Sequence, residues 1–278
     1  MAKRQPKQPA SVSVASDAAP AGALAETRDL AWTGQHEQAL AVAAGALSDA
    51  SSRLTNADRL ALHGLRVESL VALGQLAEAE SEAAAMQAIA TRDASDAARP
   101  SALCAQCLVW MRQGRFQAAE DAAHEAVAGA RRTSERRMLM HALLRLGEAR
   151  WRNHGDDAGE VAAKEAAAIA EALGDAASQG RAHWMLSGAM QNLGNMAAAQ
   201  AHAAKALTLA KRAGDDLGLG NAHNIGAGAS QDVAERLQSY QQADQAFARA
   251  GYVERRVAAQ ANLASQYMFL GLYRRGRR

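Results

Sequence analysis

Glycines recur along this chain at an almost constant interval of about forty residues. Gly34, Gly74, Gly114, Gly155 and Gly194 are separated by steps of 40, 40, 41 and 39 residues, and Gly271 follows after two more steps of similar length. A fixed period of this length is the sequence signature of a repeat array, in which each unit packs against its neighbours. We therefore expect an extended surface rather than a fold organised around a catalytic pocket.

The side chains around the glycines follow the same period. Four residues before each glycine stand Leu30, Leu70, Trp110, Trp151, Met190 and Tyr267. Two residues after it come His36, Leu76, Phe116, Asp157, Met196 and Tyr273, and five residues after it Ala39, Ala79, Ala119, Glu160, Ala199 and Gly276. A residue four positions before a helix end lies one turn back on the same face. We infer that the glycine ends one helix with a positive φ, that the +2 residue begins the next helix, and that a small +5 residue lets the two helices approach.

A second set of glycines indicates where the second helix of each unit ends. Gly174, Gly214 and Gly251 follow apolar helical stretches, and Asp175 and Asp215 stand directly after the first two of these glycines. A glycine C-cap followed by an aspartate N-cap is typical of a tight connection between two helices. Each unit is thus predicted to be an antiparallel helical hairpin, with a first helix (helix A) and a second helix (helix B).

These residues resemble the tetratricopeptide repeat (TPR) over roughly residues 22 to 278. The fullest match runs from Arg181 through Trp184, Met190 and Gly194 to Ala199, and the segment from Ala261 to Tyr273 also matches well. The resemblance implies an all-α fold, a right-handed superhelical solenoid of about six to seven antiparallel helix hairpins. The family repeat is typically about 34 residues long. The longer units here resemble the roughly 40-residue repeats of large bacterial regulators.

Two units depart from the pattern. The Gly155 unit carries Asp157 and Glu160 where an apolar and a small residue are expected, so its register is predicted to slip by one or more residues. The sixth unit lacks its turn glycine, and we expect residues 231–233 to form the turn there. Four glycines crowd the first helix of that unit, which indicates close backbone packing or, alternatively, a hinge or the approach of a ligand.

The ends of the chain differ from its repeats. Residues 1–20 are polar and lack an apolar core for a signal peptide, so we expect a disordered N-terminal tail, followed by the repeat domain over 21–278. The last repeat is expected to be incomplete, because its second helix would begin at Tyr273 and the sequence ends at Arg278. The sequence is then either a fragment of a longer protein, or its last helix A is itself the cap with an arginine-rich tail.

Composition argues against several classes of function. The 31 basic and 29 acidic residues nearly balance, and aromatic residues make up 4%, which gives no indication of a nucleic-acid partner. No apolar run is long enough for a membrane span, and a cytoplasmic location is expected. The Cys104–Cys107 pair is interpreted as buried helix packing, and the scattered histidines as surface residues. No nucleophile, metal or cofactor motif is present, so we expect no enzymatic activity, no metal and no cofactor.

The resemblance places partner binding on the concave face, which the A helices line. By position, this implies a groove formed by Arg145, Glu148, Arg152, Arg181, Trp184, Gln191, His223, Asn224 and Asn262. Asn224 and Asn262 each precede the apolar anchor of their helix, where an asparagine in the family often holds a ligand backbone; plain polar surface is the alternative. The paired Lys and Asn of the family's carboxylate clamp are not found.

The function expected from this pattern is a non-catalytic protein–protein interaction scaffold. It would be the N-terminal regulatory repeat region of a bacterial signalling protein, such as a diguanylate cyclase or kinase. The alternative is a peptide- or small-ligand-sensing repeat module of a transcriptional regulator. The expected partner is a protein or peptide, and self-association through the unpaired C-terminal helix is a further expectation.

Overall fold

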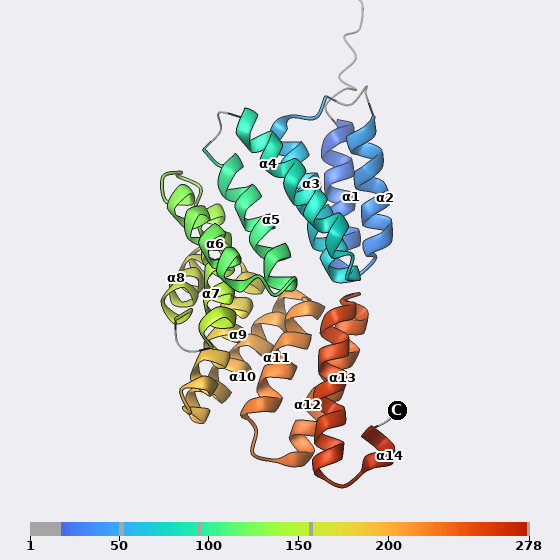
Figure 1. Cartoon of the computed structure of the whole chain (residues 1–278), viewed down its shortest axis with the longest axis vertical. Helices are drawn as coiled ribbons and strands as arrows, with labels where there is room; N and C mark the ends of the chain where they lie inside the picture. Colours follow the sequence, from blue (N-terminus) through green and yellow to red (C-terminus); the bar gives the residue numbers. More distant parts are fainter. Residues whose placement is uncertain (1–17, 50–52, 94–95, 156–157, 277–278) are drawn as a thin grey trace, which may run out of the picture.

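The computed structural model describes residues 18–49, 53–93, 96–155 and 158–276 and places fourteen helices and no strand in them (Figure 1). The helices are α1 (Ala18–Trp32), α2 (His36–Ser48), α3 (Asn56–Leu73), α4 (Leu76–Arg92), α5 (Ala98–Arg112), α6 (Phe116–Ala130), α7 (Arg136–His154), α8 (Glu160–Ala172), α9 (Ala176–Asn192), α10 (Met196–Ala213), α11 (Asp216–Ala229), α12 (Val233–Arg249), α13 (Val253–Phe269) and α14 (Tyr273–Gly276). Most of the expected N-terminal tail, residues 1–17, lies outside the described residues, and α1 begins at Ala18.

The predicted hairpin turns are confirmed. Each of the six glycines in the period has φ between +70° and +78°, the left-handed conformation that a side chain disfavours. The B helices of five units begin at the +2 residue, namely at His36, Leu76, Phe116, Met196 and Tyr273. The alanines at +5 in four units, Ala39, Ala79, Ala119 and Ala199, are fully buried in the seam between the two helices.

The register of the fourth unit slips by three residues. The sequence predicted a slip in this unit, but not the number of residues. Helix α8 begins at Glu160 rather than at Asp157, so its fourth residue is Ala163, which is 1% exposed. In the regular unit α2 the fourth residue is Ala39, and Ala163 takes the same place in the seam. Glu160 stands instead on the partly exposed first turn and pairs with Lys164 at 2.5 Å.

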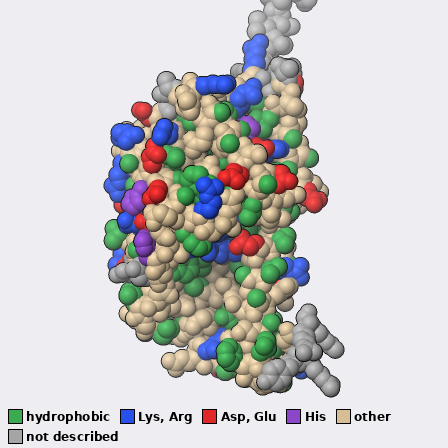
Figure 2. Space-filling view, viewed as in Figure 1, with side chains coloured by type: hydrophobic (Ala, Val, Ile, Leu, Met, Phe, Trp, Pro, Cys, Tyr) green, Lys and Arg blue, Asp and Glu red, His purple; other side chains and the backbone are tan. Residues whose placement is uncertain are grey.

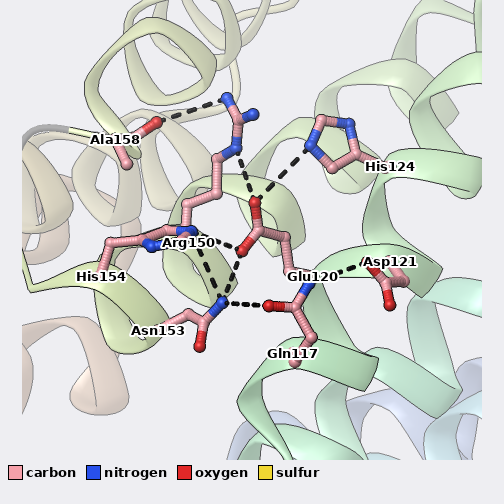
Figure 3. Close-up of polar contacts among 8 residues, drawn as sticks. All are labelled: Gln117, Glu120, Asp121, His124, Arg150, Asn153, His154 and Ala158. Atoms are coloured by element: carbon pink, nitrogen blue, oxygen red, sulfur yellow. Dashed lines mark hydrogen bonds and ion pairs between the residues drawn. The ribbon is translucent and has the colours of Figure 1, made fainter.

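A polar cluster ties this irregular connection to the preceding repeat (Figure 3). Glu120 of α6 is buried, and its carboxylate accepts hydrogen bonds from Arg150 Nε at 3.1 Å, Asn153 Nδ2 at 2.8 Å and His154 Nε2 at 2.9 Å, all on α7. Arg150 also reaches the carbonyl oxygen of Ala158 in the α7–α8 connection. The cluster therefore holds the end of α7 against α6, at the unit whose register is irregular.

The sixth unit turns without a glycine, as expected. The Asp232 carboxylate accepts hydrogen bonds from the backbone N–H groups of Ala234 and Glu235 and caps α12. In α11, a Cβ added to Gly220 would lie 2.4 Å from the ring of Phe247 on α12. Close packing therefore accounts for this glycine.

The repeats form a right-handed superhelical solenoid that closes on itself. The A helices α1, α3, α5, α7, α9 and α11 pack one after another on the inner side, and the turn of the superhelix brings α13 back beside α3 (Figure 1). The Gly34 turn of the first unit lies against the Gly251 turn between α12 and α13, where a Cβ on Gly34 would be 2.2 Å from the carbonyl oxygen of Arg249. The A helices thus enclose a central groove.

Candidate functional site

The groove contains a large cavity of about 580 Å³ between α1, α3, α5, α7 and α9. Apolar side chains form much of its wall, including those of Trp32, Leu65, Leu108, Met138 and Leu144. Charged and polar side chains are set among them, including Glu68, His141, Arg145, Asp175 and Arg181. A concave, largely apolar site with a few polar groups and a volume of roughly 300–1,000 Å³ is typical of ligand binding.

A smaller cavity of about 40 Å³ adjoins the first and shares Glu68, Leu108, Arg145 and Arg181 with it. We call it the arginine pocket, because its wall includes four arginines, Arg112, Arg145, Arg181 and Arg255. Its other lining residues are Glu68, Leu108, Glu148, Trp184, Leu217, Asn221 and Tyr252. These residues come from α3, α5, α7, α9, α11 and α13, with Tyr252 as the N-cap residue of α13, so the closed superhelix is needed to assemble it.

Glu148 lies at the centre of this pocket and is 3% exposed. Its Oε1 atom accepts hydrogen bonds from Arg112 at 3.3 Å, from Arg152 at 3.0 Å and from Arg255 at 3.2 Å. Burial alone would raise the pKa of Glu148, but the three guanidinium groups hold it well below its usual range. Arg145 pairs instead with Glu68 at 3.2 Å.

An aromatic wall completes the pocket. Trp184 is 4% exposed and meets Trp151 edge to face, with ring centroids 5.2 Å apart. The guanidinium group of Arg255 lies over the Trp184 ring, 5.3 Å from its centroid, a favourable cation–π arrangement. Gly188 makes room for this packing, because a Cβ there would lie 2.3 Å from the Trp151 ring.

Part of the groove expected from the sequence lies at this site. Arg145, Glu148, Arg181 and Trp184 line the arginine pocket, and Arg152 binds Glu148 from the adjacent turn of α7. The remaining four expected residues line neither cavity. Three of them, Gln191, Asn224 and Asn262, form hydrogen bonds that link neighbouring helices.

Gln191 donates a hydrogen bond to the carbonyl oxygen of Ile225 at 2.8 Å and thereby links α9 to α11. Asn262 Nδ2 donates to Asn224 Oδ1 at 3.1 Å and links α13 to α11. His223 is half-buried, and burial, reinforced by Lys211, lowers its pKa. A ligand-binding role for these residues stays a prediction.

The sequence interpretation missed seven residues of the arginine pocket: Glu68, Leu108, Arg112, Leu217, Asn221, Tyr252 and Arg255. A usable signal existed for Arg112, which directly follows the apolar run Leu108–Met111 in a buried helix face. A lone arginine at such a place indicates a buried partner. Arg255 gives no such signal, because it lies among the charged residues Glu254 and Arg256 and reaches the pocket only through the closure of the superhelix.

The cysteines and histidines of the chain differ in how well they were predicted. Burial raises the pKa of Cys104 to about 11 and also raises that of Cys107, so both thiols are unreactive packing groups. The description of the histidines as scattered surface residues is wrong for His36 and His183, which are 4% and 7% exposed. His183 and the partly exposed His202, 19 residues apart, stack with Nδ1 atoms 2.9 Å from each other.

The outer surface is mixed in charge. Basic and acidic side chains are interspersed on the face that Figure 2 shows, with no broad area of one sign. None of the helices in the described parts of the chain has an apolar stretch long enough to span a bilayer. The groove and its arginine pocket are therefore the most distinctive sites on the described residues.

No protein-family model and no curated protein sequence matches this chain. Solved structures do match its fold. A Rap protein in complex with competence and sporulation factor gives a TM-score of 0.69 at 15% identity, covering 92% of this chain and 73% of that one. NprR in complex with its cognate peptide NprX gives 0.61 at 12% identity, covering 95% and 77%.

A signal-transduction ATPase from Pyrococcus horikoshii, described as having a tetratricopeptide repeat sensor, gives a TM-score of 0.56 at 14% identity. This chain is a TPR-like helical-repeat protein. It spans 39% of the Pyrococcus chain, and 91% of this chain is covered. At these identities the similarity establishes the shared TPR-like fold and nothing about function.

Proposed function

We propose that this TPR-like chain is a non-catalytic regulatory module that binds an extended peptide or protein segment in its central groove. The observation that carries the proposal is the cavity of about 580 Å³ enclosed by the A helices. It combines an apolar wall, which supplies affinity, with charged groups that fix orientation. NprR, a protein of similar fold, is described with a cognate peptide, which supports the same class of ligand for this chain.

Two settings for this module follow from the sequence. One is the N-terminal regulatory repeat region of a bacterial signalling protein, such as a diguanylate cyclase or kinase, in the cytoplasm. The other is a peptide-sensing module of a transcriptional regulator. The size of the cavity favours the sensing role, because about 580 Å³ suits a short segment better than a folded domain.

The test is capture of peptides by variants in which the groove is filled. Ala61 on α3 and Ala177 on α9 both line the cavity, and both are partly exposed. Ala61→Trp and Ala177→Trp are expected to abolish binding to an array of random heptapeptides that the unchanged chain binds. Ala204→Trp on the exposed face of α10 is the matched control and should bind as the unchanged chain does. Equal binding by all four proteins would refute the groove as the site.

The same array addresses the asparagines. The Asn224→Ala/Asn262→Ala double variant is expected to weaken peptide binding if these side chains hold the ligand backbone. Unchanged binding would assign them to the α11–α13 contact alone.

Self-association stays a separate prediction, and light scattering measures it directly. Val253, Val257, Met268 and Phe269 form an exposed apolar face on α13 that such a contact would use.

A further inference from the structure

The arginine pocket carries more positive charge than its own carboxylates neutralise. Its wall holds Arg112, Arg145, Arg181 and Arg255 against Glu68 and Glu148, an excess of two positive charges. Extending the set to Arg152, Glu254 and Asp215, which interact with Glu148, Arg112 and Arg181, leaves an excess of one positive charge. Buried cations are normally paired, so an excess of positive charge in a cavity favours the binding of an anionic group there.

The hydrogen-bond donors of the pocket also exceed its acceptors. A single oxygen, Oε1 of Glu148, is shared by three arginines. Among the described residues, the Nε atoms of Arg112 and Arg255 are buried and make no hydrogen bond, and Arg112 Nε lies 3.4 Å from the carboxylate of Glu254, which is 52% exposed. The Arg112 side chain is only 6% exposed, so water reaches little of its surface.

Arg181 is the donor best placed to meet a ligand. It lines both the large cavity and the arginine pocket, and in the described ranges it makes no hydrogen bond or ion pair, although the carboxylate of Asp215 is near enough to interact with its charge. Burial, and after it the neighbouring Arg112, lowers the pKa of Arg255 to about 9, because both disfavour its charged form. A bound anion stabilises the positive charge of Arg255 and gives Arg181 a hydrogen-bond partner.

We propose that the arginine pocket binds a carboxylate of the segment that lies in the groove, so that the ligand is an acidic peptide. The proposal rests on the proposed function and names the chemistry of its ligand. Because the two cavities share Arg145 and Arg181, an extended segment in the larger cavity places one side chain in the smaller one. The planar guanidinium group matches a carboxylate with two parallel hydrogen bonds, and a cavity of about 40 Å³ suits a group of that size.

The test uses an array of random heptapeptides with blocked termini, in which each peptide is made with Glu, Gln or Lys at its central position. A parallel set lacks acidic residues but has a free C-terminal carboxylate, which separates the two sources of a carboxylate. The unchanged chain is expected to bind Glu peptides about tenfold more tightly than their Gln counterparts, since charge-assisted hydrogen bonds are the stronger ones. Lys peptides should not bind.

Arg181→Gln removes an unpaired guanidinium group and should leave the fold intact. It is expected to bind Glu and Gln peptides equally, near the level of the Gln peptides on the unchanged chain. Arg212→Gln, at an exposed position on α10, is the matched control and should keep the preference for Glu. Inorganic phosphate at constant ionic strength should compete with the Glu peptides and not with the Gln peptides.

The outcomes separate this proposal from the proposed function. Groove binding without a preference for Glu, or a preference that survives Arg181→Gln, overturns the carboxylate assignment and leaves peptide binding in place. Stabilisation by phosphate without selection of acidic peptides shows that a free phosphate occupies the pocket, which also overturns it. Absence of binding to every peptide, together with equal behaviour of the filled-groove variants, refutes both proposals.

Discussion

The imidazole Nε2 atom of His36 lies 2.9 Å from the carbonyl oxygen of Ala250, although 214 residues separate the two in sequence. His36 is 4% exposed, and its other ring nitrogen lies 3.3 Å from Ser69 Oγ. Tyr252 meets the His36 ring edge to face, with centroids 5.5 Å apart. The first and the sixth repeats are therefore in direct contact, and this contact turns an open solenoid into a closed one.

Replacing His36 tests this contact. His36→Ala is expected to lower the free energy of unfolding by about 1–3 kcal/mol, because it leaves the buried Ala250 carbonyl without a donor. Small-angle scattering should show a larger radius of gyration. His124→Ala, which alters a side chain that is 47% exposed, should change stability by less than about 0.5 kcal/mol. Equal effects of the two substitutions would argue against closure through His36.

Substitutions at two equivalent turn glycines distinguish the cost of a positive φ from the cost of opening the closed superhelix. Gly34 and Gly74 both have φ of +78°, but a Cβ on Gly34 meets the Arg249 carbonyl oxygen at 2.2 Å, whereas a Cβ on Gly74 meets nothing within 4 Å. Gly74→Ala is expected to cost about 1–2 kcal/mol of stability from the positive φ alone. Gly34→Ala should lower the free energy of unfolding, measured in urea, by clearly more than Gly74→Ala does, and it should also increase the radius of gyration. The same cost for both would mean that the two turns are not pressed together in solution.

Local chemistry explains which features the sequence could predict. The glycine turns, the first residues of the B helices and the buried +5 alanines depend on residues within one hairpin, so a period of about forty residues suffices to place them. Arg145, Glu148, Arg181 and Trp184 were placed on the inner face by the family resemblance. Tyr252 and Arg255 were not, because they reach the pocket through closure, and Arg255 lies 107 residues from its partner Glu148.

The fourth unit offers a test of the register itself. Ala163→Leu is expected to lower the free energy of unfolding by about 1–3 kcal/mol, because it overpacks the seam between α7 and α8. Glu160→Ala should change it by about 0.5 kcal/mol or less, since Glu160 is on the partly exposed first turn. Chemical denaturation of both variants decides the register. The reverse order of effects would place Glu160, not Ala163, in the seam.

The stacked histidines make stability depend on pH. Burial, with Lys205 adding to it, lowers the pKa of His183 to about 4 from an ordinary value of 6.5. As the pH falls, His183 therefore binds a proton at a higher pH in the unfolded chain than in the folded chain. The contribution of His183 is fully present above pH 6.5 and is lost as the pH falls towards 4, by at most about 3 kcal/mol.

Urea unfolding at pH 7, 5.5 and 4.5 measures this dependence. His202 stacks on His183 and also has its pKa lowered by burial, so part of the slope belongs to the pair. His183→Gln is expected to flatten the profile between pH 6.5 and 4.5. His124→Gln, at an exposed position, should leave the profile unchanged. An unaltered slope in His183→Gln would show that the pair does not titrate with folding.

The electrostatic balance of the arginine pocket depends on Glu148. Glu148→Gln keeps the size of the side chain but leaves Arg112, Arg152 and Arg255 facing one neutral oxygen, so we expect a loss of about 3–5 kcal/mol in the free energy of unfolding. Glu254→Gln is the control, because that side chain is 52% exposed and its pairing with Arg112 should be worth about 1 kcal/mol or less. Added salt should restore part of the stability of Glu148→Gln, since it screens repulsion between the arginines. A variant as stable as the unchanged chain would mean that the three guanidinium groups do not depend on this carboxylate.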